Sequence, residues 1–255
     1  MKSIAWLFLL LCICLIAQAQ KLPNIQSAGV YAPANVKIDG KTTEWNNQFQ
    51  AYNNNANLFY TLANDAGNLV LVVQTTDRTT IEKIMRNKLS FIIAGKNGSL
   101  TLKTPGVTTQ TNKDVNRAMA RKEAITDSLL TALNKGLTTS YKEMEVTGLA
   151  GVTEPKIPVY NDLGIMVAAR VDMAKAFTCE LAIPLKYLSP YLSADGSFNY
   201  NIKVNGIKLG GMIDTNGNKM ELSNADMATS TLAGFPMLDM VATYEIVGTY
   251  KLIMK

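Results

Sequence analysis

The sequence predicts an all-β protein, an antiparallel and jelly-roll-like β-sandwich that carries one inserted amphipathic α-helix. Short apolar segments of strand length recur along the chain, and turns containing Gly and Asn separate them. The chain has no alternation of strand and helix patterns of the βαβ kind, which argues against a parallel sheet. We therefore expect residues 20–255 to form one domain, with the helical insertion near residues 112–135.

Residues 1–19 have the pattern of a secretory signal peptide. Lys2 supplies a minimal basic region, and Ile4–Ala17 is an apolar run of about 14 residues. Ala17-Gln18-Ala19 then offers a small-x-small cleavage site. A membrane-spanning helix needs roughly 20 apolar residues, so an uncleaved anchor is the weaker interpretation. We expect a secreted or periplasmic protein that does not span the membrane after signal cleavage.

In the first half of the mature chain we expect a short strand at Val36–Asp39, an Asn-rich loop at 46–57 and then two hairpins. Each hairpin closes on a turn that contains Gly. The second strand of the first hairpin begins with five apolar residues in a row, as a central strand covered on both faces does. The expected elements are the strands Leu58–Ala63, Leu69–Thr75, Leu89–Ala94 and Ser99–Lys103, with a short helix at Thr80–Asn87.

The strand pattern breaks at residues 112–135. Apolar residues recur there at helical spacing, and Gly136 stands where a helix C-cap belongs. This predicts a single amphipathic helix that packs against the sandwich. The residues of its apolar face are Val115, Met119, Ile125, Leu129 and Leu133.

Alternating patterns return in the second half of the chain. We expect strands at Gly164–Met173, Phe177–Ile183 and Phe198–Asn205, and a last strand near Val241–Leu252. Pro184 follows the most regular of these strands and should end it, because proline cannot donate to a sheet.

The residue types exclude several chemistries. Histidine is absent, which excludes His-ligated zinc, His-assisted nucleophiles and a His ligand to haem. Outside the signal the only cysteine is Cys179, so the mature chain has no internal disulfide and no Cys metal cluster. We expect this thiol to be inert on an apolar strand face. Without Lys2, 24 Lys and Arg face 20 Asp and Glu in a scattered pattern, which argues against a nucleic-acid partner.

Two short motifs carry a family resemblance. They are Ile38-Asp39-Gly40 followed by Glu44-Trp45, and Glu180-Leu181-Ala182-Ile183-Pro184. Together they resemble the family 9-like carbohydrate-binding modules, a branch of the DOMON-like β-sandwiches, over most of residues 36–77 and 165–205. The resemblance implies structural roles, with a turn at the Asp-Gly pair, a tryptophan that closes the core and a strand that ends at proline. The residues that would fill these roles are Asp39, Gly40, Trp45, Glu180 and Pro184.

The same resemblance implies carbohydrate binding, for which a site needs an aromatic platform beside amide groups. In family members a pair of aromatic residues holds the terminal sugar, whereas Trp45 is here assigned to the fold. Two other regions offer suitable groups, the Asn-rich loop and a polar stripe on the strand Phe198–Asn205. Loop chemistry and a solvated sheet face are the alternative explanations. The predicted ligand-binding residues are Tyr52, Asn53, Asn55, Asn199, Asn201 and Lys203.

Asp214-Thr215-Asn216-Gly217-Asn218 places oxygen ligands at alternating positions, as calcium sites do. Its glycine is misplaced for an EF-hand, so a hairpin turn is the preferred interpretation. Calcium held by Asp214, Asn216 and Asn218 is the alternative, and no other cofactor is expected.

These observations predict an exported, non-catalytic binding module whose ligand is an oligo- or polysaccharide. The alternative from another class is a structural or interaction module of the cell envelope, with a protein partner and no sugar binding. A component of a carbohydrate-active hydrolase comes third, because it needs two facing acids in a cleft. Asp172 and Glu180 are the pair on adjacent strands, and surface salt bridges are the simpler interpretation of them.

Overall fold

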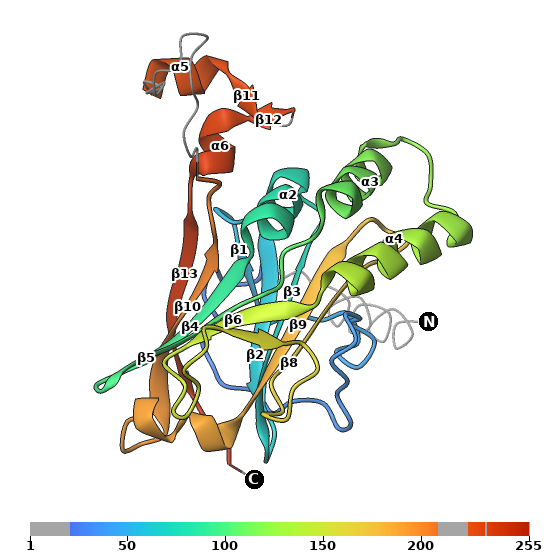
Figure 1. Ribbon diagram of the computed structural model, residues 1–255. Coiled ribbons are helices and arrows are strands. Elements are labelled where there is room, and N and C mark those ends of the chain that lie inside the picture. The colour runs from blue at the N-terminus through green and yellow to red at the C-terminus, as the bar shows by residue number, and fades with distance from the viewer. Residues whose placement is uncertain (1–20, 209–223, 233, 255) are drawn as a thin grey trace, which may run out of the picture.

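The computed structural model describes residues 21–208, 224–232 and 234–254. In this part of the chain the strands form three sheets, and every strand pair is antiparallel. The predicted β-rich, antiparallel character is therefore confirmed. Figure 1 shows the two larger sheets side by side, with the α-helices toward one end and short helical turns at the other.

The first sheet has five strands in the order β1-β2-β3-β9-β8, so β1 and β8 are its edges. Its centre is β3, whose residues Leu69 to Val73 are all buried, as a strand covered on both faces requires. The strands are β1 (Ala51–Asn53), β2 (Leu58–Asn64), β3 (Asn68–Thr75), β8 (Met166–Val171) and β9 (Phe177–Pro184).

The second sheet has six strands in the order β13-β10-β4-β5-β6-β7. A small two-stranded sheet, β11 (Thr231–Leu232) with β12 (Phe235–Pro236), lies apart from it near the top of Figure 1. The six strands are β4 (Leu89–Gly95), β5 (Gly98–Lys103), β6 (Glu143–Thr147), β7 (Lys156–Pro158), β10 (Ser197–Val204) and β13 (Tyr244–Lys251).

Both larger sheets contribute to one shared hydrophobic core. Alternate side chains of β2, β3, β8 and β9 meet alternate side chains of β4, β5, β10 and β13 there. The hydroxyls of Tyr60 on β2 and Tyr200 on β10 lie 3.1 Å apart in this core and join the sheets by a hydrogen bond. A smaller cluster, which includes Trp45, Val70 and Val72, covers the opposite face of the first sheet.

The predicted strand at Val36–Asp39 is wrong, because this segment is not part of a sheet. Its apolar residues Val36 and Ile38 instead pack against the smaller cluster on the outer face of the first sheet. The apolar residues that suggested a strand therefore contact the outer face of the first sheet instead of forming a strand of their own.

The single helix predicted at residues 112–135 is also wrong, because two helices occupy this region. They are α3 (Thr109–Ala120) and α4 (Asp127–Ser140). Thr126 separates them as the N-cap of α4, since its hydroxyl accepts the Leu129 N–H at 3.3 Å. Gly136 is no C-cap but lies inside α4, where a Cβ would stand 3.4 Å from Thr111 of α3.

The other helices are short and flank the sheets. Asp77 caps α2 by accepting the Thr80 N–H at 2.8 Å. Two 3-10 turns follow Pro184. No helix in the described residues is long and apolar enough to cross a membrane. These elements are α2 (Arg78–Asn87), η2 (Leu185–Tyr187), η3 (Ser189–Tyr191), α5 (Asn224–Thr229) and α6 (Met237–Val241).

Candidate functional site

The two family-like motifs meet at the buried carboxylate of Glu180. One oxygen, Oε2, accepts the backbone N–H groups of Asp39 and Gly40, each at 2.9 Å. The other, Oε1, accepts the indole N–H of Trp45 at 3.0 Å. Gly40 has φ +79°, and a Cβ there would stand 2.8 Å from the backbone of Arg170. The turn therefore needs glycine to lie so close to β8.

This arrangement corrects two expectations. The surface salt bridges suggested for Asp172 and Glu180 are absent: Glu180 is fully buried, and Asp172 accepts the Ala176 N–H at 2.8 Å. Burial raises the pKa of Glu180 to about 7, although the three N–H groups lower it. Trp45 does not close the core between the sheets, because it lies in the cluster on the outer face of the first sheet.

Cys179, the neighbour of Glu180 on β9, points into the shared core. Burial raises the pKa of its thiol to about 12, so the thiolate is scarce at neutral pH. This environment is that of an inert core thiol.

The predicted residues of the Asn-rich loop lie on the β1 edge of the first sheet. The ring of Tyr52 packs on Phe59 with centroids 4.4 Å apart, and its hydroxyl donates to Asn57 at 3.1 Å. Asn53 is buried and accepts the Ala56 N–H at 3.0 Å, which is turn chemistry. Asn55 is exposed. None of these three side chains lines the clefts of the described residues that are discussed below.

The predicted stripe lies on β10 of the other sheet, on the face turned away from the shared core. Asn201 and Lys203 both donate to Glu245 of β13, at 2.7 and 2.8 Å. Asn199 accepts the Thr249 hydroxyl at 2.9 Å. The stripe and the Tyr52 loop therefore do not form one site, because the stripe lies on the outer face of the second sheet and the loop lies at the β1 edge of the first.

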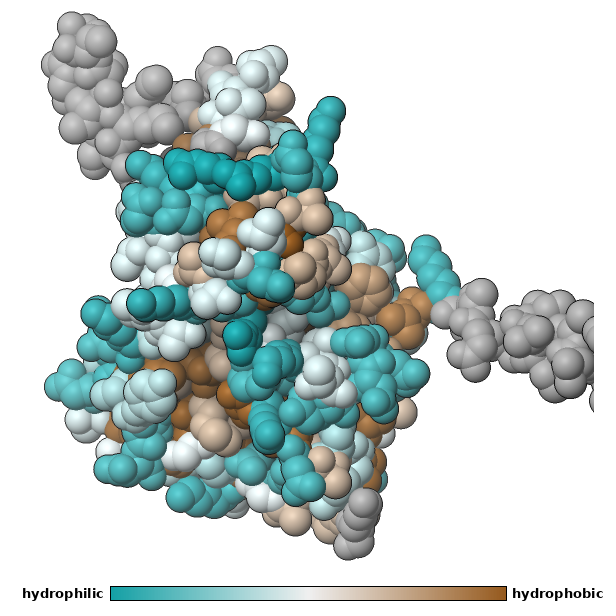
Figure 2. All heavy atoms as spheres, turned by 90° about the vertical axis from the view of Figure 1, so that its right-hand side faces the viewer, coloured by the Kyte–Doolittle hydropathy of each residue, from teal (hydrophilic) through white to brown (hydrophobic). Residues whose placement is uncertain are grey.

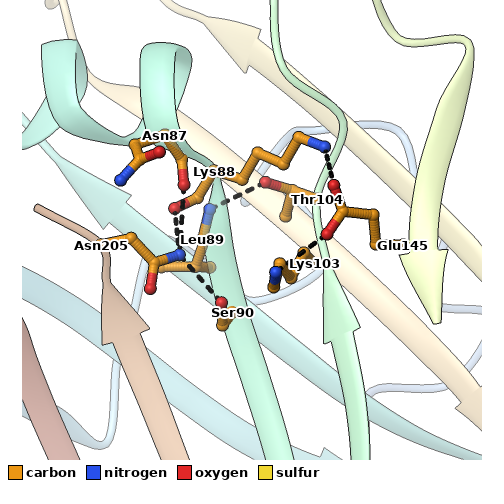
Figure 3. A network of polar contacts seen from close by, with 8 residues as sticks. All are labelled: Asn87, Lys88, Leu89, Ser90, Lys103, Thr104, Glu145 and Asn205. Atoms are coloured by element: carbon orange, nitrogen blue, oxygen red, sulfur yellow. Dashed lines mark hydrogen bonds and ion pairs between the residues drawn. The ribbon is translucent and has the colours of Figure 1, made fainter. Parts of the chain in front are cut away.

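The stripe continues into a structural network at the start of β4 (Figure 3). Asn205 donates to the Lys88 carbonyl at 2.9 Å and to the Ser90 hydroxyl at 2.8 Å. On the other side, Glu145 of β6 accepts from the ammonium groups of Lys88 and Lys103. Those hydrogen bonds lower the pKa of Glu145 to about 2. These groups use one another as partners and hold β4, β6 and β10 in register.

The calcium alternative at Asp214, Asn216 and Asn218 falls outside the described residues. It therefore stays a prediction.

A cleft with suitable polar groups lies along the free edge of β8, beside α4. Its volume is about 590 Å³. One wall is α4, with Thr131, Lys135 and Thr138, and the floor is β8. At its mouth Tyr160 is 88% exposed, the highest value among the large apolar side chains of the described residues. Figure 2 views the side of the molecule where α4 lies, and shows small apolar patches between hydrophilic side chains.

The backbone of β8 is incompletely paired in this cleft. Asn134 of α4 donates to the Val171 carbonyl and accepts the Val171 N–H, both at 2.9 Å. Since alternate residues of a strand point their N–H and C=O groups to the same side, Val167 and Ala169 present theirs to the same free edge. Neither residue has a partner on that edge within the described part of the chain.

The free stretch is closed at both ends by asparagine side chains. Asn134 occupies the edge at Val171, and Asn161 donates to the Ile165 carbonyl at 2.9 Å. Between them lie two N–H donors and two C=O acceptors, and the two residues that carry them stand about 6.8 Å apart along the strand. Because unpaired backbone groups prefer a partner, this short edge is suited to a small polar ligand.

A smaller cleft of about 270 Å³ adjoins the first, and Asn134 and Arg170 line both. It lies against Thr42 and Thr43, directly after the Asp39-Gly40 turn, and Met173 stands at its rim. The family-like turn therefore shapes one wall of the candidate site, although the turn was assigned only to the fold.

Sequence reasoning missed this site. Tyr160 and Asn161 stood in a segment with no recognisable pattern, and Asn134 stood in the predicted helix. The one available signal was the alternation in Gly164–Met173, which indicates a strand but not that this strand is an edge.

Replacing Asn134 by alanine is expected to lower the free energy of unfolding by about 2 kcal/mol, because the Val171 N–H and C=O both lose their partner. Urea unfolding measures the loss. Thr138→Ala, on the same helix and exposed, is the matched control and should stay within about 0.5 kcal/mol of the parent. If the two variants were equally stable, the Asn134 contact would contribute nothing to joining α4 to β8.

Comparisons with protein-family models, curated proteins and solved structures find no match to this chain. The resemblance to family 9-like modules therefore rests on the sequence alone and stays a prediction.

Proposed function

We propose that the chain is an exported, non-catalytic binding module of the jelly-roll-like β-sandwich type, and that it binds an oligosaccharide in the cleft between β8 and α4. The shared core between the two larger sheets supports the sandwich assignment. The export step rests on residues 1–19, which lie outside the described residues, and the extent of the single domain likewise rests on the sequence. Calcium at Asp214, Asn216 and Asn218 is not required by this proposal.

The observation that carries the proposal is the unpaired edge of β8 at Val167 and Ala169, beside the exposed ring of Tyr160. Sugar hydroxyls both donate and accept, so they match alternating N–H and C=O groups. An aromatic face next to such groups packs against the C–H face of a sugar ring. The volume of about 590 Å³ lies in the range of small-molecule sites.

A protein-binding module of the cell envelope is the second candidate, and one observation favours it. Met166, the first residue of β8, and Met173, two residues beyond its last, are 42% and 50% exposed, and an edge strand can pair with an extended peptide. The Asn134 and Asn161 side chains leave only two residues of the edge free, whereas strands commonly run to about five or six. We therefore rank the saccharide first.

The test is calorimetric titration of the chain without residues 1–19 against a panel of plant, algal and host oligosaccharides. We expect binding by at least one of them, and Tyr160→Ala should weaken it about ten-fold, a loss of about 1.4 kcal/mol. The matched control is Tyr52→Ala, which removes a tyrosine from the site predicted by sequence and should leave the affinity unchanged.

Loss of binding in Tyr52→Ala but not in Tyr160→Ala would move the site to the Asn-rich loop. Absence of binding across the whole panel would contradict the proposed function. Binding of an extended peptide instead, weakened by Tyr160→Ala, would favour the second candidate.

A further inference from the structure

Two cations line the β8–α4 cleft without an ion-pair partner. Arg170 stands on β8, where it lines both this cleft and its smaller neighbour, and Lys135 stands on α4. Within the described part of the chain, neither side chain forms a salt bridge or a hydrogen bond. The floor and one wall therefore each supply a positive charge.

The acidic groups nearby are already engaged. Asp39, which lines the larger cleft, forms an ion pair with Lys41 at 3.1 Å. Asp172, which lines the smaller one, accepts the Ala176 N–H at 2.8 Å. Glu180 is buried beneath the turn and accepts three N–H groups. The larger cleft thus has two cations, Arg170 and Lys135, and its one lining carboxylate, Asp39, already has an ion-pair partner.

The position of Arg170 is also restricted. A Cβ on Gly40 would stand 2.8 Å from Cγ of Arg170, so the Asp39-Gly40 turn lies directly against the stem of this side chain. The turn is itself held by Glu180 through two hydrogen bonds of 2.9 Å. A side chain confined in this way loses less conformational freedom when it binds a ligand.

We infer that the saccharide bound in this cleft is acidic, with a sugar carboxylate held by Arg170 and a second contribution from Lys135. This inference rests on the proposed function. A guanidinium presents two parallel N–H donors that match the two oxygens of a carboxylate, whereas an ammonium acts as a point charge. The hydroxyls of the same sugar face the free N–H and C=O groups of Val167 and Ala169. A uronic-acid oligosaccharide combines these two kinds of group.

The experiment compares each acidic probe with an uncharged form of the same sugar. Trimers of galacturonate, mannuronate and glucuronate are titrated calorimetrically beside their methyl esters, which keep the ring and the hydroxyls but lose the charge. For at least one trimer we expect the acid to bind about ten-fold more tightly than its ester, and this preference should shrink as salt is raised.

Variants then assign the preference to a residue. Arg170→Gln should abolish the preference for acid over ester, and Arg170→Lys, which keeps the charge without the fork, should retain only part of it. Tyr160→Ala should weaken acid and ester equally. The matched control is Arg121→Gln, which removes an exposed arginine that lines neither cleft and should leave the preference intact.

The outcomes distinguish a failure of the acidic-ligand inference from a failure of saccharide binding itself. Equal affinity for acids and esters, with Arg170→Gln without effect on their ratio, would overturn the acidic ligand and leave saccharide binding in place. Binding of sulfated but not of carboxylated trimers would overturn the carboxylate assignment. No binding of any trimer, charged or neutral, together with none across the wider panel, would overturn the proposed function as well.

Discussion

Replacing Glu180 by alanine is expected to lower the free energy of unfolding by about 4 kcal/mol. The change removes the acceptor of three N–H groups, which belong to Asp39, Gly40 and the Trp45 indole. Each buried donor left without a partner costs about 1–3 kcal/mol, and the lost side-chain volume adds a cavity. Urea unfolding followed by fluorescence suits this measurement, because Trp45 is the only tryptophan outside the predicted signal.

The matched control is Glu143→Ala, which removes an exposed glutamate at the start of β6. Its stability should stay within about 0.5 kcal/mol of the parent. Glu180→Gln keeps one acceptor oxygen and should fall between the two. A loss below about 1 kcal/mol in Glu180→Ala would mean that the three N–H groups find other acceptors, and would contradict a structural role for this carboxylate.

Glu180→Ala also tests how the candidate site is held in place. Glu180 holds the Asp39-Gly40 turn, the turn lies against Arg170, and Arg170 lines both clefts. Glu180 touches no part of the cleft that a ligand would reach, since it is fully buried. The Asp39-Gly40 turn, which belongs to the segment that resembles a carbohydrate-binding family, thus stabilises the fold. Through its contact with Arg170 it also positions one wall of the candidate site.

The strands that the sequence predicts correctly are those with a clear apolar pattern and turn residues at their ends. The hairpin of β2 and β3 was predicted within one residue at each strand end, because its turn contains Gly and both strands are apolar. The strands that were missed, β1, β6, β7, β11 and β12, are short. Pro158 ends β7, and a proline in a short segment gives no strand signal. Of these, β6 also depends on pairing with β5, which is distant in sequence.

The candidate site could not be predicted because it depends on sheet order. That β8 is an edge follows from its pairing with β9 alone, and that α4 lies beside it follows from the contact of Asn134 with Val171. Neither fact has a signature in the residues of β8. By contrast, Tyr52 and Asn199 stood in compositionally distinctive segments, and the structure places them on separate sheets.

The stability of the protein should also depend on pH through Glu180. Burial raises the pKa of this carboxyl group to about 7 in the folded protein, against an ordinary value of 4.5 that applies to the unfolded chain. Between these two values the folded protein holds a proton that the unfolded chain has released. Stability therefore falls as pH rises through this window. The stability that the bound proton of Glu180 contributes is fully present below about pH 4.5 and is lost as pH rises through 7.

The expected size of this effect is roughly 3 kcal/mol between the two ends of the window. Urea unfolding of the parent and of Glu180→Gln at intervals from pH 4.5 to pH 8 isolates it, because glutamine has no proton to release. We expect the parent to lose stability relative to Glu180→Gln as pH rises, and Glu143→Gln, the exposed control, to follow the parent. A difference between parent and Glu180→Gln that does not change with pH would mean that Glu180 ionises equally readily in both states. In that case the three N–H groups of Asp39, Gly40 and Trp45 would fully offset the cost of burying its charge.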